Sequence, residues 1–130
     1  MRVIQASSVQ PIWAMAQDGG RAIRYGRAMT EAAVDPVVLI NVYSCPPDRL
    51  DELMDLLAVM VRAQREIDGF VSATLHRGLN GKVAAVHAVW QSREDWKAMA
   101  RDPAINAAME PIMAIATFAP HLYEAGEVIE

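Results

Sequence analysis

Residues 70–90, FVSATLHRGLNGKVAAVHAVW, contain the pattern that decides the fold. Two runs rich in β-branched and apolar residues, Phe70 to His76 and Val83 to Trp90, flank the short segment LNGK at 79–82. The Asn-Gly pair inside that segment suits the positive φ angles of a tight hairpin turn. The pattern therefore predicts two antiparallel strands that are joined by a hairpin.

A strand and an amphipathic helix are predicted before this hairpin. Residues 37–43 are continuously apolar except for Asn41, which is typical of a strand whose two faces are both covered. Two prolines end this strand, and Asp48 is the predicted N-cap of a helix that runs to about Glu66. The apolar residues of the helix recur with the spacing of one helical face: Leu50, Leu53, Met54, Leu57, Met60 and Val61.

A second helix and a last strand are predicted after the hairpin. Ser92, followed three residues later by Asp95, forms a capping box, and Asp102-Pro103 restarts the helix with Asp as its cap. Residues 121–129 are predicted to form the last strand. The apolar face of the interrupted helix comprises Trp96, Met99, Ala100, Ile105, Ala108, Met109 and Ile112.

The resulting order β-α-β-β-α-β predicts an α+β fold of the ferredoxin-like type, a four-stranded antiparallel sheet with both helices on one face. Because the strands are so apolar, the other face of the sheet needs cover as well. A second copy of the same sheet is the simplest cover. The sequence therefore predicts a symmetric homodimer with its sheets face to face.

Residues 1–36 differ from the domain predicted over residues 37–130. They contain four arginines and three carboxylates, so their net charge is +1. Since the whole chain has a net charge of −4, the remaining residues have a net charge of −5. We interpret this segment as an N-terminal arm. Two alternatives remain open for it, a partly ordered tail and an arm that packs on a partner subunit.

Composition excludes several classes of function. The chain has 130 residues, of which 53% are hydrophobic, enough for one domain with a core. Its net charge of −4 argues against nucleic acid as a partner, and no apolar run approaches the roughly 20 residues that cross a bilayer. The only cysteine, Cys45, indicates a reducing compartment, so we expect a cytoplasmic protein. Neither a metal nor a cofactor is expected, because no metal-ligand cluster or nucleotide motif occurs in the sequence.

Three stretches show a family resemblance: LINVY at 39–43, IDGFVSATLHRGLNGKVAAVHAVWQSREDW at 67–96 and DPAINAAMEPI at 102–112. Residues 37 to about 127 resemble the antibiotic biosynthesis monooxygenase family. The resemblance lies in the pattern Gly-Phe-x-Ser-Ala-x-x-His, in the short turn with Gly that follows it, and in the strand that ends in Trp-x-Ser. The fold of that family is the dimeric α+β barrel. The resemblance implies a ligand cavity between the sheet and the helices of each subunit. Some members are cofactor-independent oxygenases that convert anthrone-like polyketides to quinones.

The same resemblance points to particular residues. In those oxygenases a histidine on the second strand and the tryptophan that ends the third are implicated, and they match His76 and Trp90. Other positions depart from the oxygenase pattern, because Val86 stands where the family has Asn and Trp96 where it has Tyr. The family's arginine also has no counterpart in the region of residues 109–110.

A haem-degrading branch of the family is matched only in part. Asn41 stands where that branch has an asparagine, but Met99 and Met109 occupy the places of its tryptophan and its proximal histidine. Without that histidine the sequence argues against haem as a cofactor.

Each candidate residue has a structural alternative. His76 is predicted as a general acid or base, or as a surface histidine beside the hairpin. Trp90 shares a strand face with small alanines and is either a wall of the pocket or a core residue. Asn41 contacts a ligand or makes a structural hydrogen bond, since a buried amide needs a partner. The predicted substrate-binding residues are Asn41, Tyr43, Val86, Trp96, Met99 and Met109.

We therefore expect a cofactor-free monooxygenase that oxidises an anthrone-like or quinol-like aromatic compound with O₂. In this hypothesis His76 transfers protons, Trp90 and Trp96 stack on the ring, and Asn41 binds a substrate oxygen. The alternatives are a non-redox small-molecule-binding or stress-related barrel protein, and an isomerase or lyase on the same fold. The expected partners are a small aromatic molecule and a second copy of the chain.

Overall fold

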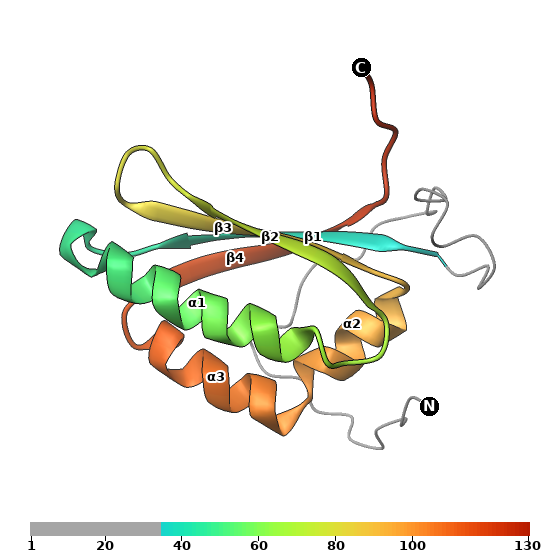
Figure 1. The fold of residues 1–130 in the computed structure, drawn as a ribbon, viewed down its shortest axis with the longest axis horizontal. Coiled ribbons are helices and arrows are strands. Elements are labelled where there is room, and N and C mark those ends of the chain that lie inside the picture. Colours follow the sequence, from blue (N-terminus) through green and yellow to red (C-terminus); the bar gives the residue numbers. More distant parts are fainter. Residues whose placement is uncertain (1–34) are drawn as a thin grey trace.

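The computed structural model describes residues 35–130, so the N-terminal arm predicted over residues 1–36 lies almost entirely outside the described residues. Three α-helices pack on one face of a four-stranded antiparallel sheet with the strand order β2-β3-β1-β4 (Figure 1). The predicted ferredoxin-like α+β fold is thereby confirmed. The elements in chain order are β1 (Val37–Ser44), the 3-10 turn η2 (Pro47–Arg49), α1 (Leu50–Gln64), β2 (Phe70–Arg77), β3 (Val83–Trp90), α2 (Arg93–Ala100), α3 (Pro103–Met113) and β4 (Thr117–Glu124).

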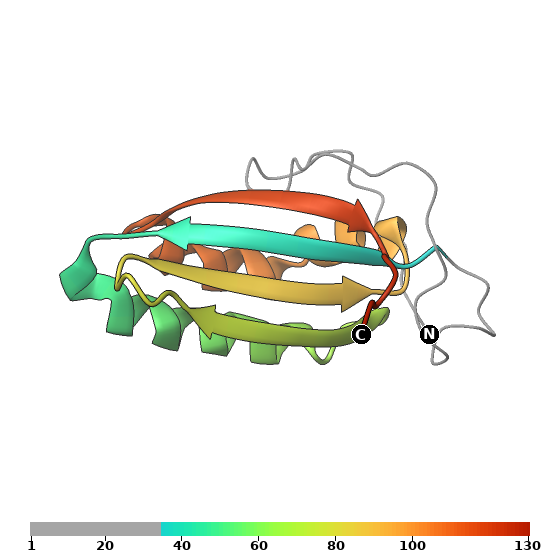
Figure 2. The ribbon, with the colours of Figure 1, turned by 90° about the horizontal axis from the view of Figure 1, so that it is seen from above.

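The core lies between the sheet and the helices. Successive side chains of a strand point to opposite faces, so alternate residues of the central strands β1 and β3 enter this layer. On the helix side they are at most 5% exposed: Val37, Leu39, Asn41, Tyr43, Ala84, Val86, Ala88 and Trp90. Among residues 35–130 no helix covers the opposite face, on which all four strands are visible (Figure 2). We call this opposite side the open face.

The bounds of the last strand differ from the prediction. β4 spans Thr117–Glu124, whereas the sequence suggested residues 121–129. The observed strand includes Pro120, which has no N–H to donate to a sheet ladder. β4 is an edge strand that pairs only with β1, and at an edge a proline N can face away from the sheet.

The start of α1 also differs. Asp48 lies inside the turn η2, and α1 begins at Leu50 with Arg49 as its N-cap and no side-chain capping bond. The two prolines shape a 3-10 turn first, which moves the helix start beyond Asp48. Both later caps are confirmed: the Asp95 N–H donates to Ser92 Oγ (3.1 Å), and the Ala104 N–H donates to Asp102 Oδ1 (2.8 Å).

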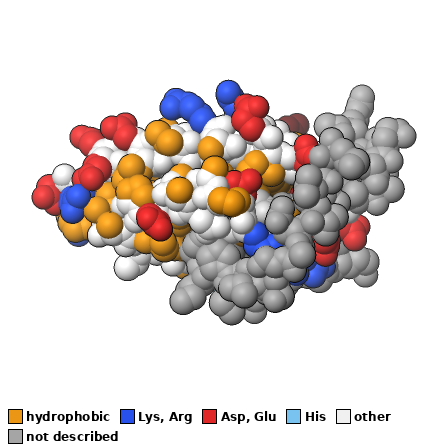
Figure 3. All heavy atoms as spheres, turned by 90° about the horizontal axis from the view of Figure 1, so that it is seen from below, with side chains coloured by type: hydrophobic (Ala, Val, Ile, Leu, Met, Phe, Trp, Pro, Cys, Tyr) orange, Lys and Arg blue, Asp and Glu red, His pale blue; other side chains and the backbone are white. Residues whose placement is uncertain are grey.

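The helix layer has a mixed outer surface. Apolar and charged side chains are interspersed over it (Figure 3), with Val59 and Met113 among the exposed apolar ones. Within residues 35–130 no helix is long and apolar enough to cross a membrane.

Gly69, just before β2, lies in close contact with Asp95 of α2. Its φ of 92° lies in the left-handed region, and a Cβ there would stand 2.3 Å from Asp95 Cγ. The Gln91 N–H donates to the Gly69 carbonyl (2.8 Å), so the turn before β2 and the chain after β3 are held together. Glycine is required here both for its backbone angle and for the close approach of Asp95.

We expect Gly69→Ala to destabilise the protein more than Gly81→Ala does. Gly81 also has a positive φ, 76°, but a Cβ at this position would meet no other atom. The Gly81→Ala variant therefore measures only the cost of an alanine at positive φ, about 1–2 kcal/mol. Displacement of Asp95 should add roughly 1–3 kcal/mol at Gly69. Urea denaturation of both variants checks this, and equal losses would show that the approach of Asp95 contributes nothing.

Candidate functional site

All but one of the predicted site residues meet in the layer between the sheet and the helices. Two strands and two helices supply them, and each is at most 2% exposed. These residues are Asn41 and Tyr43 on β1, Val86 and Trp90 on β3, Trp96 and Met99 on α2, and Met109 on α3. We call this set the buried site.

A polar pair on β1 forms one part of the buried site. Asn41 Nδ2 donates a hydrogen bond to Tyr43 Oη at 2.9 Å. The Tyr43 hydroxyl accepts this bond and keeps its own proton for another acceptor. Asn41 Oδ1 has no hydrogen-bond partner, although it is fully buried. Such an atom costs about 1–3 kcal/mol of stability unless something else satisfies it.

Burial also controls the ionisation of Tyr43. The pKa of the phenol is raised well above its ordinary value, because desolvation disfavours the phenolate. Tyr43 therefore remains a neutral hydrogen-bond donor at physiological pH. Its ring packs against Phe118 of β4 at a centroid distance of 5.4 Å, which holds the hydroxyl in place.

Two tryptophans form another part of the buried site. Trp90 and Trp96 are 0% and 1% exposed, and neither indole Nε1 has a hydrogen-bond partner. Phe70 of β2 supports Trp90 edge-on, with ring centroids 5.4 Å apart and planes at 87°. Buried indole N–H groups normally find an acceptor, so these two donors are available to a bound molecule.

Gln64 is a polar residue of this layer that the sequence analysis missed. It is the last residue of α1, is 2% exposed, and its Oε1 lacks a partner. The helical spacing could have revealed it, since Gln64 follows Met60 by four residues on the apolar face. Arg101 Nε, just after α2, is the other buried polar atom without a partner among the described residues.

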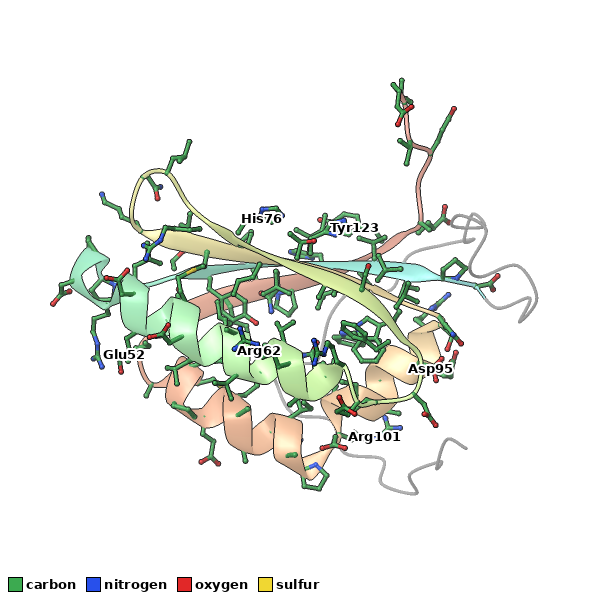
Figure 4. The ribbon with its side chains drawn as sticks, in the orientation of Figure 1. Glu52, Arg62, His76, Asp95, Arg101 and Tyr123 are labelled. Atoms are coloured by element: carbon green, nitrogen blue, oxygen red, sulfur yellow. The ribbon has the colours of Figure 1, made fainter. Side chains whose placement is uncertain are left out.

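His76 is the predicted residue that the structure separates from the rest. It is exposed on β2 and lies on the open face, on the far side of the sheet from the helices (Figure 4). Its neighbour Leu75 packs against the core, and alternation along the strand sends His76 the other way. His76 therefore does not lie with Trp90 in the buried site of its own subunit.

The buried site combines apolar side chains with unpaired hydrogen-bonding atoms, the chemistry that suits a flat apolar molecule bearing oxygen atoms. Its walls are valine, methionine and indole side chains, and its unpaired atoms comprise donors and acceptors. Within residues 35–130 no group of three or more His, Cys, Asp or Glu side chains could hold a metal ion.

The four-stranded antiparallel sheet with its helices on one face defines a ferredoxin-like α+β domain, and its helix-facing layer buries unpaired polar atoms beside two tryptophans. The chain matches the family model of antibiotic biosynthesis monooxygenases over residues 36–111, and it belongs to this family. The resemblance inferred from the sequence is confirmed.

Individual relatives agree with this assignment. Over 73 residues the chain is 38% identical to the tetracenomycin-F1 monooxygenase of Streptomyces glaucescens, spanning 55% of this chain and 65% of that relative. SnoaB, a cofactor-independent oxygenase from Streptomyces nogalater, has a similar structure, with a TM-score of 0.67 and 20% identity over 73% of this chain and 97% of SnoaB. A structure described as a putative family member from Deinococcus radiodurans gives a TM-score of 0.64 at 20% identity, over 72% and 96% of the two chains. At this identity the two structures show a shared fold.

We expect Tyr43→Phe alone to lower the free energy of unfolding by about 1–3 kcal/mol, because Asn41 Nδ2 then loses its acceptor. The double variant Asn41→Leu/Tyr43→Phe removes both partners and the unpaired Oδ1, so its stability should return towards that of the wild type. Urea denaturation of the two variants measures this. A double variant less stable than Tyr43→Phe would mean that Asn41 is a structural residue.

Proposed function

We propose that the protein is a cofactor-independent monooxygenase that oxidises an anthrone-like or quinol-like, polyketide-type aromatic compound with O₂. The observation that carries this proposal is the set of unpaired hydrogen-bonding atoms buried at Asn41, Trp90 and Trp96. Family membership and the named activity of the tetracenomycin-F1 relative support it. The single cysteine is consistent with a cytoplasmic enzyme.

The substrate itself supplies the electrons in this proposal. An anthrone that loses a proton becomes an electron-rich anion, which can reduce O₂ without a redox centre in the protein. One oxygen atom becomes the new carbonyl of the quinone, and the other leaves as water with the two hydrogens of the oxidised carbon. The protein then provides orientation and exclusion of bulk water.

The buried site suits the anion that forms. The indole N–H groups of Trp90 and Trp96 are free to donate to a developing oxyanion, an interaction that is strong in a water-excluded layer. Asn41 Oδ1 can accept from a substrate hydroxyl, and Tyr43 can donate its proton in a further hydrogen bond. The side chains of Val86, Met99 and Met109 are the apolar walls.

The spacing of the polar atoms favours a fused-ring ligand. Trp90 pairs with Val37, four residues along β1 from Asn41, so the backbone positions of Asn41 and Trp90 differ by about 13 Å along the strand direction. The residues between them on the sheet, Leu39 and Ala88, are apolar. A fused-ring compound is longer than a single aromatic ring and matches this separation along the sheet better.

The oxygenase proposal predicts O₂ uptake by metal-stripped protein with anthrones, together with formation of the quinone. Trp90→Phe keeps an aromatic ring but loses the N–H, and the rate should fall on the order of 100-fold, as for the loss of one oxyanion donor. An oxygen electrode and the absorbance of the quinone measure both quantities.

His76→Ala is the matched control. It removes the imidazole on the open face and should leave the rate unchanged, because His76 lies outside the buried site. A rate that falls with His76→Ala but not with Trp90→Phe would contradict the proposed assignment.

A non-redox binding protein is the second candidate. The observation that favours it is that Tyr43 is the only titratable side chain in the buried site as defined, and burial keeps it neutral. The enzyme therefore depends on an acidic substrate, whereas a binding protein does not. Aromatic compounds that raise the melting temperature of the protein but cause no O₂ uptake would favour the binding protein over the oxygenase.

We also propose that a second copy covers the open face. The outward residues of the four strands include no Asp, Glu, Lys or Arg, and Val42 and Tyr123 are 42% and 45% exposed. An uncharged sheet face of this kind favours association with a matching surface. These outward residues are Val38, Ile40, Val42, Ser44, Ser72, Thr74, His76, Val83, Ala85, His87, Val89, Thr117, Ala119, His121 and Tyr123.

Val42→Lys should weaken the dimer roughly 100-fold or more, because it would bury an unpaired charge at a symmetric interface. Val59→Lys is the control, since Val59 is 60% exposed on α1, away from the open face. Sedimentation velocity over a range of concentrations separates the two variants. A monomeric wild type, or a dimer unaffected by Val42→Lys, would contradict this arrangement.

A further inference from the structure

The end of the buried site beneath the last turn of α1 contains an acceptor that no step of the proposed reaction uses. Gln64 belongs to the inward face of α1 with Leu57 and Met60, where an apolar residue would cost less. Its Oε1 is buried without a partner. A buried carbonyl of this kind in a native core calls for a water or a ligand group that satisfies it.

The backbone links the last residue of α1 to Phe70, the residue that contacts Trp90. The Ile67 N–H donates to the Gln64 carbonyl (3.0 Å), and the Phe70 N–H donates to the Ile67 carbonyl (3.2 Å), so a short turn links Gln64 to Phe70. Phe70 pairs with Trp90 in the sheet and touches its ring.

Trp96 belongs to the same end of the molecule. Gly69, just before Phe70, is in close approach to Asp95, the residue that precedes Trp96. In Figure 1 the end of α1 and the start of α2 lie at the same end of the sheet. This end of the layer therefore combines one unpaired acceptor, Gln64 Oε1, with two unpaired donors, the indole N–H groups of Trp90 and Trp96.

We propose that Gln64 determines specificity in the buried site by accepting a hydrogen bond from a hydroxyl group on a terminal ring of the aromatic ligand. The neighbouring indole N–H groups donate hydrogen bonds to other oxygen atoms of the same ligand. The ligand class is thus a fused-ring compound with a free hydroxyl at one end, and a methyl ether at that place is discriminated against because it leaves Oε1 unpaired. The inference rests on the proposed function in requiring an aromatic ligand, but not on the oxidation.

The test uses two redox-inert probes. One is an anthraquinone with a hydroxyl at the outer edge of a terminal ring, away from the quinone carbonyls so that it makes no internal hydrogen bond. The other is its methyl ether. Dissociation constants come from the quenching of tryptophan fluorescence. Wild type should bind the hydroxyl compound about tenfold more tightly than the ether, the effect of one hydrogen bond in a buried site.

Gln64→Met keeps the length of the side chain and removes the carbonyl. It should abolish the preference for the hydroxyl compound and leave the melting temperature of the ligand-free protein unchanged or higher. Arg62→Met is the control on the exposed side of the same helical turn and should change neither constant.

Wild type without a preference for the hydroxyl, including no binding of either probe, overturns the proposal. So does a Gln64→Met variant that keeps the preference, or one whose ligand-free melting temperature drops, since either result makes Gln64 a structural residue. Failure of the oxygenase proposal appears separately in the O₂-uptake assay, because neither probe is oxidised.

Discussion

The antiparallel pairing of β1 with β3 is the constraint on which the rest of the structure depends. Its register sets Asn41 opposite Val86 and Val37 opposite Trp90, and strand alternation then decides which side chains face the helices. A slip of one residue would exchange the buried site with the open face. Fold, candidate site and proposed dimer surface are consequences of this one pairing.

The helix-facing layer departs from ordinary core chemistry in a specific way. Most of its residues are apolar and buried, but Asn41, Gln64, Trp90 and Trp96 each bury a polar atom without a partner. Stability alone disfavours such atoms, because each desolvated group costs free energy that no bond in the protein returns. The proposed ligand would satisfy these groups, and in that way the proposal relates the packing of the domain to its function.

Local patterns predicted most of the architecture. The hairpin, the caps at Ser92 and Asp102 and the apolar face of α1 involve residues close in the sequence. The structure agrees with each of these predictions. The start of α1 was missed for a local reason, the 3-10 turn at the two prolines, whereas the other errors depend on neighbours distant in sequence. Pro120 is tolerated because β4 is an edge strand, and the residues around Pro120 do not show where in the sheet the strand lies. Gln64 fits the helical spacing of the apolar face, but its burial depends on the elements packed against the last turn of α1.

The sequence by itself determined the ferredoxin-like order of elements and the apolar face of α1, since strand alternation and helical spacing are properties of neighbouring residues, and its motifs indicated the family. Only the tertiary structure decided that His76 lies across the sheet from Trp90, and that Asn41 bonds to Tyr43 while its own carbonyl stays unpaired. Hydrogen-bond partners and burial depend on which elements meet in space. A sequence pattern indicates which polar groups are candidates for the site, but it does not show their hydrogen-bond partners.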